Sequence, residues 1–205
     1  MKGTTHLAAG ITAGASLTLA LSAESAAEAF ILTGASALGA ILPDIDCKSN
    51  SIAVKIYKNI VTFITIIVML YVIVKHYMHL PTNTCISPPL YYTSISISGI
   101  IFAGLCILGR LTKHRSFTHS ILGLCMFVSN FYILTGKPYA LAFGLGMLSH
   151  ITLDLFNKRG EQLLFPLPYS FNVGIAKTNG IVDKVLGLIF SAISVILCGI
   201  IIGGF

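Results

Sequence analysis

Charged residues are scarce in this chain. Lys, Arg, Asp and Glu together make up 10% of its 205 residues, whereas a soluble domain carries about 25%. Hydrophobic residues supply 55% of the chain, and its mean hydropathy is +0.88. This composition excludes a soluble globular domain. Because the chain also lacks a long charged or Pro/Ser-rich linker, we interpret residues 1–205 as one integral-membrane domain.

Two further absences narrow the class of protein. The five cysteines show no CxxC or zinc-finger spacing, so the sequence predicts no structural role for disulfides. The net charge is +6, yet there is no basic helix and no interleaved pattern of basic and aromatic residues. Nucleic acid is therefore not an expected partner. The basic residues carry information about membrane topology instead.

Long apolar runs dominate the sequence. A membrane helix needs about 20 apolar residues, and the runs predict an all-α, polytopic membrane helix bundle of about five to seven hydrophobic helices. The expected helices are residues 6–23, 26–42, 60–74, 92–109, 121–135, 140–155 and 185–205. With the N-terminus in the cytoplasm, all but Lys75 and Lys137 of the 13 Lys and Arg residues lie on the cytoplasmic side, as the positive-inside rule requires.

The most polar stretch, KHRSFTHS at 113–120, lies between two apolar runs. Its imidazoles at His114 and His119 can bind a transition metal, and the planar fork of Arg115 can bind a phosphate or carboxylate. A plainer reading is a positively charged loop against lipid headgroups, with Ser116 or Ser120 capping the next helix.

Other ionisable residues fall on the same cytoplasmic face. His6 opens the first expected helix from that side. Pro43 ends the second expected helix and leaves Asp44 and Asp46 in a turn or extended segment. These two aspartates can bind a metal or simply form an Asx turn. Glu161 lies on this side without an assigned role.

The sixth expected helix ends with a histidine and an aspartate four residues apart, His150 and Asp154. This spacing places both side chains on one helix face. They can therefore reach one metal ion, or the carboxylate can orient a buried histidine. Asp183 precedes the seventh expected helix, and we expect it to form a salt bridge with Lys177 or Lys184.

Ionisable residues in or near a membrane are costly and usually mark function. Histidine and carboxylate ligands suit zinc, iron or manganese, and two such ions about 3.5–4 Å apart can hydrolyse phosphoesters. We therefore expect two or more divalent ions, with zinc favoured over iron and manganese. The expected ligands are His6, Asp44, Asp46, His119, His150 and Asp154. His114 is either a further ligand or the general acid for the leaving group, and Arg115 is expected to bind the phosphate.

The chain resembles a known family in several motifs. They are GTTHLAAG around His6, LPDID at 42–46, HRSFTHS at 114–120, SHITLDLFN at 149–157 and LLFPLP at 163–168. The family is YdjM-like, described as inner-membrane, metal-dependent hydrolases induced under the SOS response in some bacteria. The resemblance implies a multi-pass protein of the bacterial inner membrane.

The YdjM-like family is in turn similar to zinc-dependent phospholipase C and P1 nuclease. These all-helical enzymes carry an H-x-x-x-D pair, which His150 and Asp154 match, and this likeness implies phosphodiester hydrolysis. They also use an N-terminal tryptophan at the metal site, whereas this chain has none. The resemblance therefore does not extend to an identical metal arrangement.

The sequence favours a membrane-embedded, metal-dependent hydrolase that cleaves a phosphoester bond of a phospholipid or other lipid phosphate at the cytoplasmic face. Membrane lipid is the expected partner, because the basic residues there attract anionic lipid. Residues 157–183 are expected either to lie on the membrane interface or to form an ordinary connector. One alternative is a metal-ion or small-solute transporter, which would hold its ligands near the membrane midplane. Another is a non-catalytic metal-binding scaffold.

Overall fold

The computed structural model of the protein describes residues 1–47, 56, 59 and 88–205. In this part of the chain, long α-helices and two short 3-10 turns are the only regular elements apart from two isolated β-bridges. The α-helices are α1 (Gly3–Ala20), α2 (Ala26–Ile41), α4 (Pro88–Leu111), α5 (Ile121–Thr135), α6 (Lys137–Leu155) and α7 (Ile181–Gly203). The 3-10 turns are η1 (Leu42–Asp46) and η2 (Phe117–His119). The expected all-α helix bundle is confirmed.

Three of the described helices are long and apolar enough to cross a membrane. They are Ala26–Asp46, which joins α2 to η1, Ser94–Leu111 within α4, and Ile181–Gly203, which is α7. Helix α5 is apolar but shorter. The expected helix at 60–74 lies outside the described residues, as does Cys85, and the described cysteines form no disulfide with one another.

Four helices begin before their expected starts: α1 at Gly3, α4 at Pro88, α6 at Lys137 and α7 at Ile181. Helix α6 starts at Lys137 because Gly136, with φ +88°, reverses the chain directly after α5, and Pro138 suits the first helical turn. Helix α7 starts at Ile181, so Asp183 lies in its first turn, where a negative charge favours the helix dipole. Polar residues at these helix starts hide the true boundaries from a reading of hydropathy alone.

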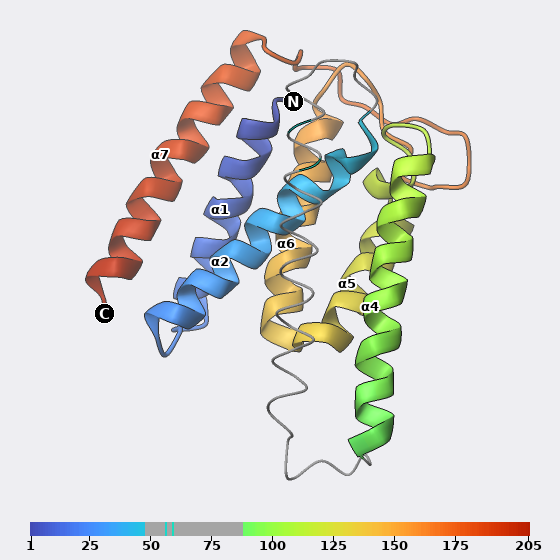
Figure 1. The fold of residues 1–205 in the computed structure, drawn as a ribbon. Coiled ribbons are helices and arrows are strands. Elements are labelled where there is room, and N and C mark those ends of the chain that lie inside the picture. The colour runs from blue at the N-terminus through green and yellow to red at the C-terminus, as the bar shows by residue number, and fades with distance from the viewer. Residues whose placement is uncertain (48–55, 57–58, 60–87) are drawn as a thin grey trace.

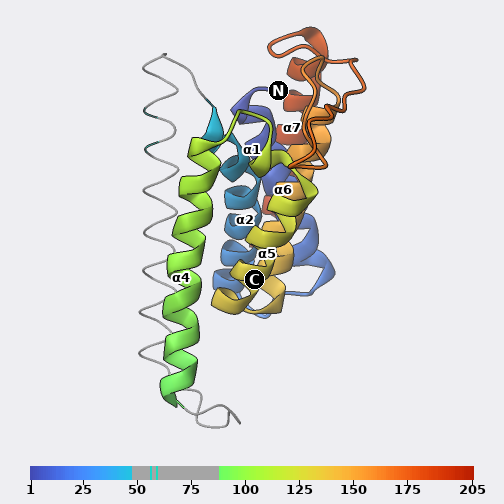
Figure 2. The same cartoon turned by 90° about the vertical axis from the view of Figure 1, so that its right-hand side faces the viewer.

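Helix α2 is central to the bundle. It packs against α1 on one side and α6 on the other, while α7 lies along α1 (Figure 1). Helix α5 packs between α6 and α4 (Figure 2). This order places the last turns of α2 and α6 beside the first turn of α1.

Glycines allow α2 and α6 to cross at backbone contact. A Cβ atom on Gly146 of α6 would lie 1.8 Å from the Ser36 carbonyl oxygen, and one on Gly39 of α2 would lie 2.1 Å from the Phe143 carbonyl oxygen. Small residues promote such close packing between membrane helices. Because His150 follows Gly146 by one helical turn, this crossing also carries His150 to the end of α2.

Gly146→Ala is therefore expected to force α2 and α6 apart and to destabilise the fold by about 1–3 kcal/mol. Gly34→Ala is the matched control on α2, because nothing lies within 4 Å of its added Cβ atom. This control is expected to leave the melting temperature unchanged or to raise it, since alanine is the better helix former. Thermal unfolding in detergent checks both variants, and equal melting temperatures would contradict the close crossing.

Buried aromatic rings hold the turn η2 against the helices. Phe131 and Phe143 stack with ring centroids 4.4 Å apart. Phe117, from η2, lies 6.0 Å from Phe127 of α5, and both rings are buried. The backbone that carries His119 is thereby fixed to the hydrophobic core.

Candidate functional site

Histidine and carboxylate side chains cluster at the end of the bundle that holds the N-terminus, where α2 and α6 end (Figure 1). Among the described residues, three overlapping groups have ligand atoms within 4.8 Å of one another. The groups are His6–His150–Asp154, Asp44–His119–His150 and His119–Asp154–Glu161. We call these six residues the metal-ligand cluster. All of them are buried except Asp44, whose side chain is 19% exposed.

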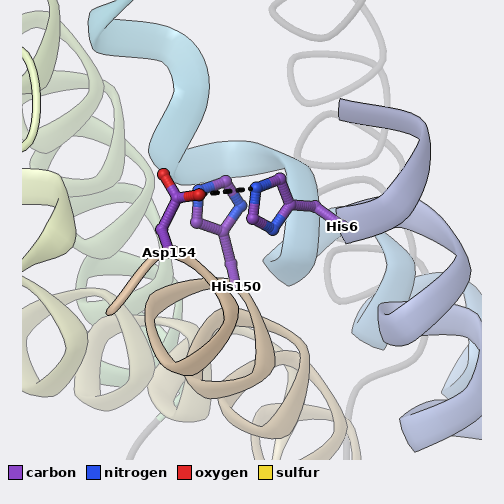
Figure 3. Close-up of side chains that lie close together, drawn as sticks. All are labelled: His6, His150 and Asp154. Carbon is purple, nitrogen blue, oxygen red and sulfur yellow. Dashed lines mark ion pairs between the residues drawn. The ribbon is translucent and has the colours of Figure 1, made fainter. Parts of the chain in front are cut away.

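His6 joins α1 to the last turns of α6. Its ring stacks on that of His150, with centroids 3.7 Å apart and planes inclined by 15°, and Asp154 lies at their edge (Figure 3). Nε2 of His6 lies 3.2 Å from Oδ1 of Asp154, but neither ring nitrogen of His6 forms a hydrogen bond within the described part of the chain. Because buried polar atoms are nearly always satisfied, these nitrogens are available to a ligand.

His119 and His150 face each other through their Nε2 atoms, which are 3.2 Å apart. On the far side of the rings, Nδ1 of His150 lies 2.6 Å from the carbonyl oxygen of Ala40, and Nδ1 of His119 lies 3.3 Å from Oδ2 of Asp46. These two oxygens only accept hydrogen bonds. The Thr118 hydroxyl, 3.0 Å from Nδ1 of His119, donates its own proton to Asp46 and so accepts as well. Each Nδ1 therefore carries a proton. Two lone pairs would then face each other, and the pair requires a cation between the rings, either a proton or a metal ion.

Asp46 lies behind His119 and outside the three groups. Its Oδ1 is 2.6 Å from Nδ1 of His114, and its Oδ2 accepts hydrogen bonds from the Thr118 hydroxyl at 2.7 Å and the Arg115 backbone N–H at 3.0 Å. With these partners the carboxylate orients two histidines. The sequence predicts a direct ligand here, and this stays a prediction; Asp46 contacts two histidines, as carboxylates that support a metal-binding histidine commonly do.

The turn that carries these residues is built by local hydrogen bonds. Ser120 accepts a hydrogen bond from the Gly123 N–H at 2.9 Å and so caps α5, as one of the two expected caps. Its hydroxyl also donates to the Phe117 carbonyl at 2.7 Å. Arg115 adopts φ +66°, and this left-handed conformation accompanies the hydrogen bond from its N–H to Asp46. The stretch KHRSFTHS therefore caps α5, as one of its two readings predicts, and it also contributes His119 to the cluster; binding of a metal or phosphate by this stretch stays a prediction.

Arg115 is engaged inside the site. Its terminal guanidinium nitrogens donate to Oδ2 of Asp154 and to the Arg159 carbonyl oxygen. Its Nε–H is buried and has no partner. The residue expected to bind phosphate thus holds a cluster carboxylate and keeps this one donor free.

Glu161 is a cluster residue to which the sequence alone assigns no role. Its side chain is completely buried, and Oε1 lies 3.9 Å from Nε2 of His119. Neither carboxylate oxygen has a hydrogen-bond partner among the residues that the structure describes. Two backbone hydrogen bonds of 2.8 Å with Phe171 hold it in place. The available signal was its rarity, since it is one of only seven acidic residues.

Burial and charge shift the pKa values of two cluster residues that lie outside the α-helices, His119 and Glu161. Burial lowers the pKa of His119, but the carboxylates of Asp46, Glu161 and Asp44 outweigh it and raise the pKa to about 9. Burial raises the pKa of Glu161 to about 8, against the opposing effect of His119. Both residues therefore carry a proton at neutral pH when no ion is bound.

Asp183 serves a different purpose from the cluster. Its carboxylate accepts hydrogen bonds from the Asn179 N–H at 2.7 Å, the Thr5 hydroxyl at 2.8 Å and the Lys2 N–H at 3.2 Å. These contacts tie the start of α1 to the start of α7. The expected salt bridge with Lys177 or Lys184 is replaced by these hydrogen bonds.

Comparison with known proteins gives one match. The model of a family described as YdjM inner membrane protein matches residues 1–204. A search of curated proteins and a search of solved structures found no match.

Proposed function

This chain belongs to the YdjM inner membrane protein family, and we propose that it is a metal-dependent hydrolase that cleaves phosphoester bonds in membrane lipids. One observation carries the proposal: the Nε2 atoms of His119 and His150 face each other at 3.2 Å. Carboxylates surround this pair, and Nε2 of His150 lies 3.8 Å from Oδ1 of Asp44. Converging lone pairs and carboxylates of this kind form a binding site for a divalent cation.

The donor set fits the proposed metal. Three imidazoles and three carboxylates suit zinc, iron or manganese, and coordination of an ion would satisfy the buried unpartnered atoms of His6 and Glu161. Asp154 belongs to two of the three groups. Ions held there supply Lewis acidity and activate water for attack on phosphorus. The proposed ligands are His6, Asp44, His119, His150, Asp154 and Glu161.

The remaining residues act around this centre. Asp46 fixes the ring of His119 and, through Oδ1, the ring of His114. His114 is 30% exposed and contacts Asp46 through Nδ1, so its Nε2 can deliver a proton to the leaving group of a substrate that arrives from outside the protein. Arg115 positions Asp154, and its free Nε–H can meet a phosphoryl oxygen.

Lipid phosphate is the proposed substrate class because of where the cluster lies. The family is one of inner membrane proteins, and the cluster occupies the ends of the helices, where phosphate headgroups meet a bilayer. His114 and Asp44 form the outer, partly exposed edge of the site. A transporter would hold such ligands near the midplane, so we do not propose transport.

Headgroup release from metal-loaded protein tests this function. Wild-type protein in mixed micelles is expected to liberate a phosphorylated headgroup or inorganic phosphate from at least one phospholipid class. His114→Ala is expected to lower kcat by about 10²–10⁴-fold, the usual contribution of a general acid, while the metal content stays constant. Lys113→Ala, at the exposed neighbouring residue, is the matched control. Absence of release from a full phospholipid panel would contradict the hydrolase, and equal rates in the two variants would contradict the role of His114.

A further inference from the structure

The segment 156–177, which follows α6, displays a dense set of apolar side chains; we call it the interfacial segment. Leu164, Leu167, Tyr169, Phe171, Val173 and Ile175 are all between 40% and 64% exposed. Soluble surfaces rarely carry so many neighbouring apolar groups, and a patch of this kind marks a contact surface.

The charge of the same region has one sign. Between residues 156 and 184, the exposed charged side chains are all Lys or Arg, namely Lys158, Arg159, Lys177 and Lys184. The two acidic residues in this range, Glu161 and Asp183, are completely buried. A surface that is both apolar and cationic fits the boundary between the headgroups and the acyl chains of an anionic bilayer.

We propose that the interfacial segment lies in the headgroup layer of an anionic lipid leaflet, with its apolar side chains directed into the acyl boundary. The segment lies at the level where α4 and α6 end and α7 begins (Figure 2), and aromatic residues such as Tyr169 and Phe171 are typical of that depth. It also continues directly into α7, a helix that exposes most of its apolar surface.

Backbone pairing joins the interfacial segment to the metal-ligand cluster. Phe171 exchanges two hydrogen bonds of 2.8 Å with Glu161, and the Gln162 N–H donates to the Arg115 carbonyl oxygen at 2.9 Å. Phe171 therefore has two roles. Its backbone holds Glu161 in the cluster, and its exposed ring belongs to the interfacial segment. The proposed lipid contact does not depend on the proposed hydrolase function. Only the idea that this contact helps to deliver substrate to the cluster rests on that function.

The absence of tryptophan makes the inference directly measurable. Tyr169→Trp creates a protein with a single tryptophan on the segment, and Ile196→Trp creates one on the exposed face of α7 as a reference for the acyl region. Both variants are reconstituted into vesicles of phosphatidylcholine with or without phosphatidylglycerol. The depth of each tryptophan in the bilayer is then measured by fluorescence quenching. Two lipids carry the quencher, one near the headgroup and one near the acyl terminus, and acrylamide serves as the quencher in the aqueous phase.

The tryptophan fluorescence of the Tyr169→Trp protein is expected to be quenched at least about twofold more strongly by the headgroup-level lipid than by the acyl-terminal lipid, as an interfacial position requires. The Ile196→Trp reference is expected to show the opposite order. Replacing Lys158, Arg159 and Lys177 together by glutamine in the Tyr169→Trp protein is expected to weaken lipid quenching in the anionic vesicles and to leave it unchanged in neutral ones.

Three results would overturn the inference. Strong acrylamide quenching with no lipid quenching would place the segment in water. Protection from both quenchers would mean that protein, such as a second copy of the chain, covers it. If the glutamine substitutions changed lipid quenching equally in both vesicle types, the segment would have no preference for anionic lipid. Because the fluorescence needs no turnover, failure here is distinguishable from failure of the hydrolase, which headgroup release reports separately.

Discussion

Replacing His150 with alanine is expected to abolish phosphoester hydrolysis and to weaken metal binding by more than about a hundredfold. His150 belongs to two of the three ligand groups, and its Nε2 faces Nε2 of His119. Loss of a supporting residue around a metal already costs about 10–100-fold in affinity, so loss of this direct ligand is expected to cost more. Metal titration with a competing chelator, followed by headgroup release from phospholipid micelles, measures both effects.

The neighbouring Ser149→Ala variant is the control for this experiment. Its hydroxyl is half-buried and bonds only to the Gly146 carbonyl oxygen of its own helix, at 2.7 Å. His150→Ala also leaves the Ala40 carbonyl oxygen without its partner, a cost of about 1–3 kcal/mol. Size-exclusion chromatography and helical circular dichroism therefore accompany the titration. A folded His150→Ala protein that binds metal as tightly as Ser149→Ala would refute the ligand assignment.

Metal affinity is expected to rise steeply with pH. The pKa of Glu161 is about 8 and that of His119 about 9, so both carry protons below pH 8 in the ion-free protein. An incoming ion must displace both protons, and each displaced proton makes the affinity change about tenfold per pH unit. The affinity is thus expected to increase about a hundredfold per unit between about pH 6 and 8, and about tenfold per unit from there to about pH 9.

Glu161→Gln separates the two protons. The amide cannot release a proton, so the slope below pH 8 is expected to fall to about tenfold per unit, with the proton of His119 as its source. Lys113→Ala, whose side chain is exposed and outside the cluster, is expected to keep the steeper slope. Zinc titrations at several pH values, corrected for protonation of the competing chelator, give these slopes. Identical slopes in wild type and Glu161→Gln would remove Glu161 from the site.

Local sequence signals were sufficient to predict a structural feature where all the residues that determine it lie in one segment. The helix expected at 121–135 matches α5 to the residue, because Ser120 caps its start and Gly136 ends it. The four-residue spacing of His150 and Asp154 likewise put both on the inner face of α6, where they meet His6 (Figure 3). These features depend on helix periodicity and capping, and both can be recognised from the local sequence.

Tertiary contacts decided what the sequence left open. Asp44 and Asp46 are near neighbours in one 3-10 turn, yet one faces His150 and the other the outer side of His119. Glu161 reaches the cluster because its backbone pairs with Phe171, ten residues away in an irregular segment. No periodic pattern encodes such pairing. Asp183 similarly binds backbone N–H groups from two separate segments.

The metal content of the wild-type protein tests the central claim most directly. The chain is purified in detergent without chelator, and bound zinc, iron and manganese are counted per chain by elemental analysis. Two ions per chain are expected, held by the six residues of the metal-ligand cluster. A folded protein that contains no such ion, and takes up none when zinc is supplied at pH 8, would contradict the account.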